Sequence, residues 1–187
     1  YFPDTPATGP NIVLIPPMMV SANVYDVTEH NGAVSVLHSN GITPWVIDFG
    51  SPDHEEGGME RNLADHVVAV SRAVDWIIES TGRDVHVGGY SQGGMFAYQA
   101  AAYRRSRGVA SVITFGSPVD VLAALPLGLP AALVAPGAEV LADKVFPHLW
   151  VPSWLARLGF QLLDPVKTAR SRLDFLRQLH DRDALLP

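Results

Sequence analysis

A glycine-rich turn around Ser91 is the stretch of this chain best suited to chemistry. Gly89, Ser91 and Gly93 form the pattern Gly-x-Ser-x-Gly, typical of a nucleophile elbow, a tight turn between a strand and a helix. The turn strains the serine, so its neighbours must be small, and Gly94 is a further small residue. The pattern predicts a serine hydroxyl at a helix N-terminus, where backbone N–H groups and the helix dipole favour a developing negative charge.

The residues on both sides of the turn predict the strand and the helix that the pattern needs. Residues 84–88 form a short β-rich run, and residues 95–103 form an apolar run of helical character. This context favours a serine that attacks the carbonyl carbon of an acyl group. The alternative is a serine that only caps the helix.

A serine nucleophile also needs backbone donors for the oxyanion that forms during its reaction. One donor is the N–H of the residue after the nucleophile, here Gln92, and the other comes from the loop after an early strand. Pro16 and Pro17 have no N–H, so Met18 is the first residue of that loop able to donate. The alternative is that this loop is only an apolar turn.

The acid and the base of such a site are harder to place, because both follow the nucleophile in this type of site. Only His148 and His180 follow Ser91 among the histidines. His148 lies in an aromatic segment typical of a cap, and His180 lies on a charged helical stretch typical of a solvated face, so neither is favoured. Asp120 comes just after the strand ending at Phe115, where an orienting acid can lie, although capping of the next segment is the favoured interpretation.

Composition excludes several classes of function. The chain has 187 residues, 48% of them hydrophobic, a net charge of −6 and no cysteine. Nucleic-acid binding has no electrostatic support, and neither a disulfide framework nor a thiolate metal site is available. His54, Glu55 and Glu56 match no known spacing of metal ligands, so we expect no metal and no cofactor. The lack of cysteine fits a reducing compartment, and we expect a cytoplasmic protein.

The elements that must position Ser91 alternate along the first two thirds of the chain. Apolar runs predict strands and amphipathic runs predict helices, which together indicate an α/β fold with a doubly wound, mostly parallel sheet. Ser91 would then lie beyond the carboxyl ends of the strands, where such sheets hold their sites. The expected strands cover residues 11–15, 42–49, 84–88 and 109–115, and the expected helices cover residues 24–39, 63–78 and 95–103.

The alternation stops after Pro118, which predicts a core over residues 1–118 and a different region over residues 119–187. Residues 121–142 are nearly all apolar but contain three prolines, which argue against a membrane-spanning helix. We expect a partial helical cap that covers the serine, with weak contact to a membrane interface as a lesser alternative. A second alternative is that these residues simply complete the core. The first residue is not Met, and no recognisable strand or helix closes the end of the sequence. We therefore expect these residues to be part of a longer chain.

Four motifs in the same order resemble those of poly(3-hydroxyalkanoate) synthases and their hydrolase-like relatives. They are Val-Leu-Ile-Pro-Pro at residues 13–17 and the segments at residues 46–52, 88–94 and 114–120. The resemblance implies an α/β-hydrolase core with a mobile cap, and acyl transfer from coenzyme A thioesters through a covalent acyl-enzyme. The synthases have cysteine where this chain has Ser91, and a serine ester suits hydrolysis or transfer to an alcohol as well as polymerisation. The family's catalytic Asp and His lie after the cap, where no residue of this chain corresponds to them.

These observations predict a serine enzyme of acyl transfer or hydrolysis, acting on an acyl ester or acyl-CoA-type thioester in lipid or polyester metabolism. Without a recognisable base, the chain taken alone is expected to be a poor catalyst. The alternative is a non-catalytic hydrolase-like module that binds an acyl chain or a partner domain.

Overall fold

The computed structural model describes residues 8–18, 20–28, 31–52, 54–120, 131–144, 158, 165–179 and 181. The chain divides into two compact units, Tyr1–Val119 and Asp120–Pro187. Each unit is treated separately below, and all residues that position Ser91 belong to the first.

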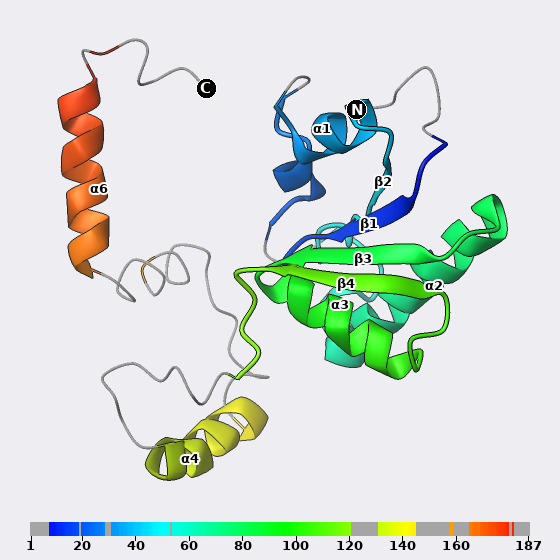
Figure 1. Ribbon diagram of the computed structural model, residues 1–187. Helices are drawn as coiled ribbons and strands as arrows, with labels where there is room; N and C mark the ends of the chain where they lie inside the picture. Colours follow the sequence, from blue (N-terminus) through cyan, green and yellow to red (C-terminus); the bar gives the residue numbers. More distant parts are fainter. Residues whose placement is uncertain are drawn as a thin grey trace. The chain divides into compact units, whose positions relative to one another are not determined.

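A four-stranded parallel sheet forms the centre of the first unit (Figure 1). Its strands are β1 (Asn11–Ile15), β2 (Thr43–Val46), β3 (Val85–Tyr90) and β4 (Val109–Phe115), in the order β2-β1-β3-β4. Strand β1 is buried along its whole length, as expected for a continuous apolar run with parallel neighbours and covered faces. The parallel α/β fold predicted from the sequence is therefore confirmed.

Helices cover both faces of this sheet, so the sheet is doubly wound (Figure 1). They are α1 (Ala33–Ser39), α2 (Leu63–Thr81) and α3 (Gln92–Tyr103). Successive side chains of a strand point to opposite faces. Val13 and Ile15 accordingly join the core formed with α2 and α3, whereas Ile12 and Leu14 join a second cluster with Val34 of α1.

The ends of α2 follow from the local sequence. Asn62 precedes the helix, and its side-chain oxygen accepts from the amides of Ala64 and Asp65, while the Asp65 carboxylate accepts from the Asn62 amide. This reciprocal capping box satisfies donors that the first turn leaves unpaired. Gly82 follows the helix in the left-handed region, with φ of 68°, which glycine adopts without a side-chain clash.

One predicted helix is wrong, and one predicted strand is too long. Residues 24–39 do not form a single helix: a 3₁₀ helix, η1 (Ala22–Tyr25), is followed by a turn before α1 begins. The Thr28 hydroxyl accepts from the Asn31 amide in this turn, and such side-chain bonds compete with helix formation. Strand β2 covers only Thr43–Val46 of the expected residues 42–49, and the polar loop beyond it contains the short 3₁₀ helix η2 (Gly58–Glu60).

The second unit contains two described helices, α4 (Ala131–Lys144) and α6 (Pro165–Gln178). Pro136 lies inside α4, while residues 121–130 of the predicted apolar segment lie outside the described residues. Helix α6 exposes several apolar side chains, including Leu173, Phe175 and Leu176. In the part of the chain that the structure describes, no helix combines the length and the apolar character needed to cross a membrane. That this unit covers Ser91 as a cap stays a prediction.

Candidate active site

Ser91 connects β3 to α3 in a strained backbone conformation. Its φ of 52° and ψ of −120° lie in a region that residues with a side chain rarely adopt. The Ser91 amide donates to the carbonyl of Phe115 at 2.8 Å, which ties the turn to the end of the neighbouring strand β4. Strand, strained serine and helix therefore follow one another as a nucleophile elbow requires.

The glycines around Ser91 allow three chain segments to meet without side chains. A β-carbon at Gly89 would overlap the backbone of Gly93, and one at Gly93 would overlap the carbonyl oxygen of Ile15. A β-carbon at Gly94 would overlap the hydroxyl of Ser117. These glycines serve close packing of α3 against the ends of β1, β3 and β4.

The Ser91 hydroxyl does not cap the helix it precedes. Ser91 is the N-cap residue of α3, yet its side chain makes no capping hydrogen bond. The alternative of a purely capping serine is therefore wrong. Within the described residues, the amide of Gln92 has no hydrogen-bond acceptor either. An unbonded hydroxyl thus adjoins an unbonded N–H at the positive end of a helix, where negative charge is stabilised.

Met18, the other predicted oxyanion donor, lies beside Gln92. Strands β1 and β3 are parallel neighbours with Ile15 opposite Gly89, so the segments that follow them meet at one edge of the sheet. There the Met18 amide donates to the side-chain Oε1 of Gln92 at 3.2 Å. The structure brings the two residues together, but an incoming oxyanion would have to replace Gln92 Oε1 as the acceptor of the Met18 N–H. The oxyanion role of both residues stays a prediction.

No base for Ser91 is found among the described residues. His148 and His180 lie outside them, and none of the four described histidines, His38, His54, His66 and His86, bonds to Ser91. Nδ1 of the buried His66 is 2.8 Å from the Asn62 carbonyl oxygen, and its ring stacks on Phe96, so it is part of the core. Nδ1 of His86 is 2.8 Å from Ser111 Oγ on the neighbouring strand.

Two further expectations from the sequence concern an orienting acid at Asp120 and the presence of a metal site. Asp120 is exposed and is the first residue of the second unit, so its predicted role as an orienting acid stays a prediction. Among the residues that the structure describes, no three histidine or carboxylate side chains gather as metal ligands would.

Tyr25 belongs to the site region although the sequence indicated only an apolar helix position there. Its hydroxyl donates to the carbonyl of Ile15 at 2.8 Å and accepts from the amide of Tyr90 at 2.9 Å. Burial raises the pKa of this phenol, and the bond from the Tyr90 amide partly opposes that rise. No local pattern could have revealed the role, because both partners are backbone groups of other elements, 10 and 65 residues away.

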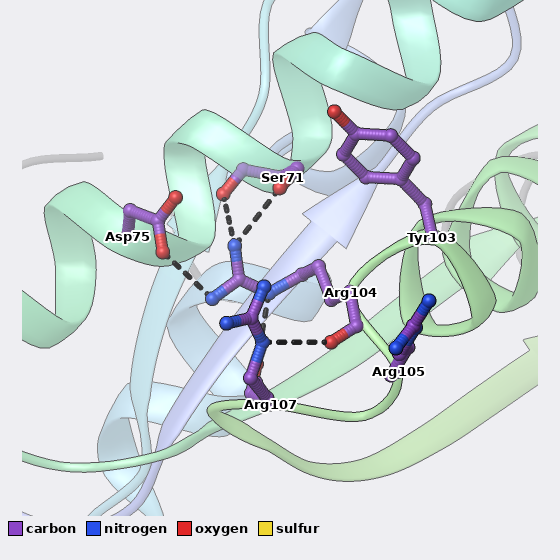
Figure 2. Close-up of a pocket in the computed structure, with 6 residues that line it drawn as sticks. All are labelled: Ser71, Asp75, Tyr103, Arg104, Arg105 and Arg107. Atoms are coloured by element: carbon purple, nitrogen blue, oxygen red, sulfur yellow. Dashed lines mark hydrogen bonds and ion pairs between the residues drawn. The ribbon is translucent and has the colours of Figure 1, made fainter.

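A second polar cluster surrounds the opposite end of α3, at Arg104 (Figure 2). Arg104 is 8% exposed, and its guanidinium donates to the carbonyl and hydroxyl of Ser71, to Asp75 and to the carbonyl of Arg107. The pocket here measures about 630 Å³ and is also lined by Tyr103 and Arg105. Because β4 begins beside this pocket and Ser91 follows the end of β3, the pocket lies at the edge of the sheet opposite the elbow. Its bonds join α3 to α2, which is a structural role.

Comparison with one solved structure, a bacterial lipase, agrees with the fold. No protein-family model and no curated protein matches the sequence. The mature form of the Bacillus licheniformis lipase BlEst2 matches with a TM-score of 0.51 and 21% identity, over 83% of this chain and 52% of the lipase. The NocB thioesterase domain, solved as a covalent complex with a fluorophosphonate nocardicin G analogue, matches with a TM-score of 0.44 and 22% identity, over 75% of this chain and 59% of that domain. This chain thus spans about half the length of the lipase, and the likeness to the lipase shows a shared fold alone.

Proposed function

We propose that Ser91 is the covalent nucleophile of an enzyme that hydrolyses or transfers acyl groups from an acyl ester or an acyl-CoA-type thioester. One observation carries this proposal: Ser91 has a strained backbone, and its hydroxyl makes no hydrogen bond to α3. A serine with a merely structural role gains nothing from such strain, whereas a nucleophile gains exposure at a helix N-terminus.

The chemistry follows from the groups around this turn. Ser91 Oγ would attack the carbonyl carbon of the substrate and lose its proton to a base. The resulting oxyanion would accept hydrogen bonds from the free amide of Gln92 and, after Gln92 Oε1 moves away, from the amide of Met18. Collapse would break the bond to the leaving alcohol or thiol, which takes up a proton, and leave an ester on Ser91. Water or an alcohol would then release the acyl group.

The base would come from outside the described residues, and Asp120 remains a candidate for the orienting acid. None of the described histidines bonds to Ser91, whereas His148 and His180 lie outside the described ranges. Without a correctly placed base, binding and oxyanion stabilisation alone still leave some catalysis.

The substrate class rests on the apolar surroundings of the elbow and on the family resemblance. The side chains of Tyr90 and Phe115, at the ends of β3 and β4, are about half exposed. Apolar surface of this kind suits an acyl chain. The four motifs shared with poly(3-hydroxyalkanoate) synthases support a role in lipid or polyester metabolism. Cytoplasmic location is part of the same proposal.

The lack of a base among the described residues favours one second candidate. In it, the chain is a non-catalytic module that holds an acyl chain or a partner domain. The two candidates differ at Ser91, because only an enzyme needs a reactive hydroxyl there.

Labelling with a fluorophosphonate probe tests the proposal. We expect the probe to form a covalent adduct that peptide mass spectrometry maps to Ser91, and Ser91→Ala to abolish both the adduct and the turnover of short acyl esters. Ser106→Ala, at an exposed serine on the far side of α3 that also has a positive φ, is the control and should label normally. If Ser91→Ala retains the adduct or most of the turnover, Ser91 is not the nucleophile, and the non-catalytic candidate gains support if no adduct forms at all.

A further inference from the structure

The hydroxyl of Tyr25 lies between strands β1 and β3, at a point where a direct hydrogen bond between the two strands is expected. Along β1, the Leu14 carbonyl accepts from the Ile47 amide just beyond β2. Because successive carbonyls of a strand point to opposite sides, the Ile15 carbonyl faces β3. With Ile15 opposite Gly89 in a parallel pair, the next bond would join the Tyr90 amide to that carbonyl.

That direct bond is replaced by a bridge through Tyr25. The Tyr90 amide donates to the Tyr25 hydroxyl at 2.9 Å, and the hydroxyl donates to the Ile15 carbonyl at 2.8 Å. The phenol satisfies both backbone groups, and the oxygen atom between them spreads the two strands. The pairing cannot continue, because Pro17, the next residue on the side that faces β3, has no N–H to offer.

The bridge joins the two segments that carry the proposed oxyanion site. Tyr90 immediately precedes Ser91, and Ile15 begins the path through Pro16 and Pro17 to Met18. The separation of these segments therefore sets where the Met18 amide lies relative to the nucleophile. Close packing of α3 also depends on it, since Gly93 has no room for a side chain against the Ile15 carbonyl.

Tyr25 is held in place for this task by its own surroundings. It ends η1 and is 7% exposed, in a cluster with Ile12, Leu14 and Val34. Burial raises its pKa, so the hydroxyl keeps the proton that it donates to Ile15. The ring fills the apolar layer while its oxygen reaches the sheet edge.

We infer that Tyr25 is a positioning residue for the nucleophile, whose hydroxyl sets the distance between Ser91 and the loop of Met18. This inference rests on the proposed role of Ser91. Tyr25 touches no reacting atom. It acts through the backbone of Tyr90 and Ile15, so its loss should slow the chemical step and leave binding of a small probe unchanged.

Tyr25→Phe tests the inference, because it keeps the ring and removes only the bridge. With the fluorophosphonate probe, we expect the maximal labelling rate kinact at Ser91 to fall by about 10- to 100-fold, the range produced by misplacement of reacting groups by about 1 Å. The half-saturating probe concentration KI should stay within about twofold, since no probe contact is removed. An unchanged kinact, or a loss confined to KI, would overturn the inference.

Two control variants separate positioning from general weakening. Val34→Ala removes packing from the same cluster but leaves the hydroxyl bridge, so kinact per folded molecule should not change. Tyr103→Phe removes an exposed hydroxyl at the other end of α3 and should change nothing. If Val34→Ala slows labelling as much as Tyr25→Phe does, the effect is one of packing, and the inference fails.

Hydrogen exchange keeps the inference testable even if Tyr25→Phe does not fold. In the unsubstituted chain, the Tyr90 amide should exchange as slowly as the inner amides of β3, because it is bonded to a buried hydroxyl. Exchange as fast as in an exposed loop would contradict the bridge. Failure of the proposed function is a separate result, in which Ser91→Ala retains labelling or turnover whatever Tyr25→Phe does.

Discussion

The two ends of helix α3 treat their polar groups in opposite ways. At the N-terminus, the Ser91 hydroxyl makes no bond to the helix, and the Gln92 amide has no acceptor among the described residues. At the C-terminus, Arg104 is almost fully buried and makes hydrogen bonds to Ser71, Asp75 and Arg107 (Figure 2). Polar groups that only hold a fold together are paired, because an unpaired buried group is costly. The end that leaves its groups unpaired is the end available for chemistry.

Strain is present at both ends, so strain alone does not mark the site. Arg105 and Ser106 also have positive φ angles, of 51° and 58°, in the turn that leads to β4. There the backbone closes on itself, since the Ser106 amide donates to the Ala101 carbonyl at 2.8 Å. At Ser91 the strain coincides with an unbonded hydroxyl at a helix N-terminus, and this combination distinguishes the two ends.

The largest effect is expected from Ser91→Gly. Where the base is in place, loss of the hydroxyl should lower acyl-ester turnover by at least about 10³-fold, as removal of a nucleophile does. Glycine accepts the backbone conformation of Ser91 without strain, so the free energy of unfolding should rise by about 1 kcal/mol. Turnover assays and urea denaturation measure the two effects.

Ser106→Gly is the matched control, because it relieves a positive φ at the opposite end of α3. It should stabilise the fold to a similar extent and leave turnover unchanged. A Ser91→Gly protein that is less stable than the unsubstituted chain would show that the serine contributes to the fold and would weaken the contrast between the two ends.

Gly89→Ala should have the next largest effect, since a methyl group there would overlap the backbone of Gly93. We expect a loss of about 3 kcal/mol or more in the free energy of unfolding, because backbone atoms cannot move aside as side chains can. Gly88→Ala is the control on the same strand, where a methyl group would make only ordinary contacts with Ile12 and Leu14. Equal losses for the two variants in thermal or urea unfolding would show that the elbow is not tightly packed.

Arg104→Met should reduce stability and spare the chemistry. It removes all the bonds of the guanidinium, including those to the carbonyl and hydroxyl of Ser71, which should cost about 2–3 kcal/mol. Labelling of Ser91 per folded molecule should not change. Arg177→Met, which breaks the exposed pair with Asp174, is the control and should cost less than about 0.5 kcal/mol. Slower labelling in the Arg104 variant would mean that the two ends of α3 are coupled.

The smallest effect is expected from Asp75→Asn. The hydrogen bond and charge of Arg104 hold the pKa of Asp75 below its usual 3.8, but this carboxylate is 57% exposed. At neutral pH the substitution should therefore cost no more than about 1 kcal/mol.

The pH dependence gives the sign of the Asp75 contribution. A lowered pKa in the folded chain means that this stabilisation is present above pH 3.8 and is lost as the pH falls below it through the folded value. Asp75→Asn should remove that part of the acid sensitivity. Unfolding curves of the two proteins that stay parallel below pH 4 would show that the pair contributes nothing.

Much of the fold could be predicted from local patterns in the chain. The apolar run of β1, the amphipathic spacing of α2 and the left-handed Gly82 each act over a few residues, so their sequence is sufficient evidence for them. The expected helix over residues 24–39 was wrong because of an interaction that is also local: the turn at Thr28 competes with the helix.

The candidate site divides in the same way. The Gly-x-Ser-x-Gly pattern determined by itself that residue 91 could lie on a strained strand-to-helix turn, since strain and close approach restrict which residues can stand there. Only the tertiary structure decided that the Met18 amide bonds to the Gln92 side chain, that Tyr25 bridges β1 and β3, and that Arg104 joins α3 to α2. The Met18–Gln92 and Arg104–Asp75 contacts join residues that are 74 and 29 positions apart. The Tyr25 contacts join a side chain to backbone groups of other elements. No local pattern encodes such pairs, because they exist only once parallel strands and packed helices bring distant segments to the same edge of the sheet.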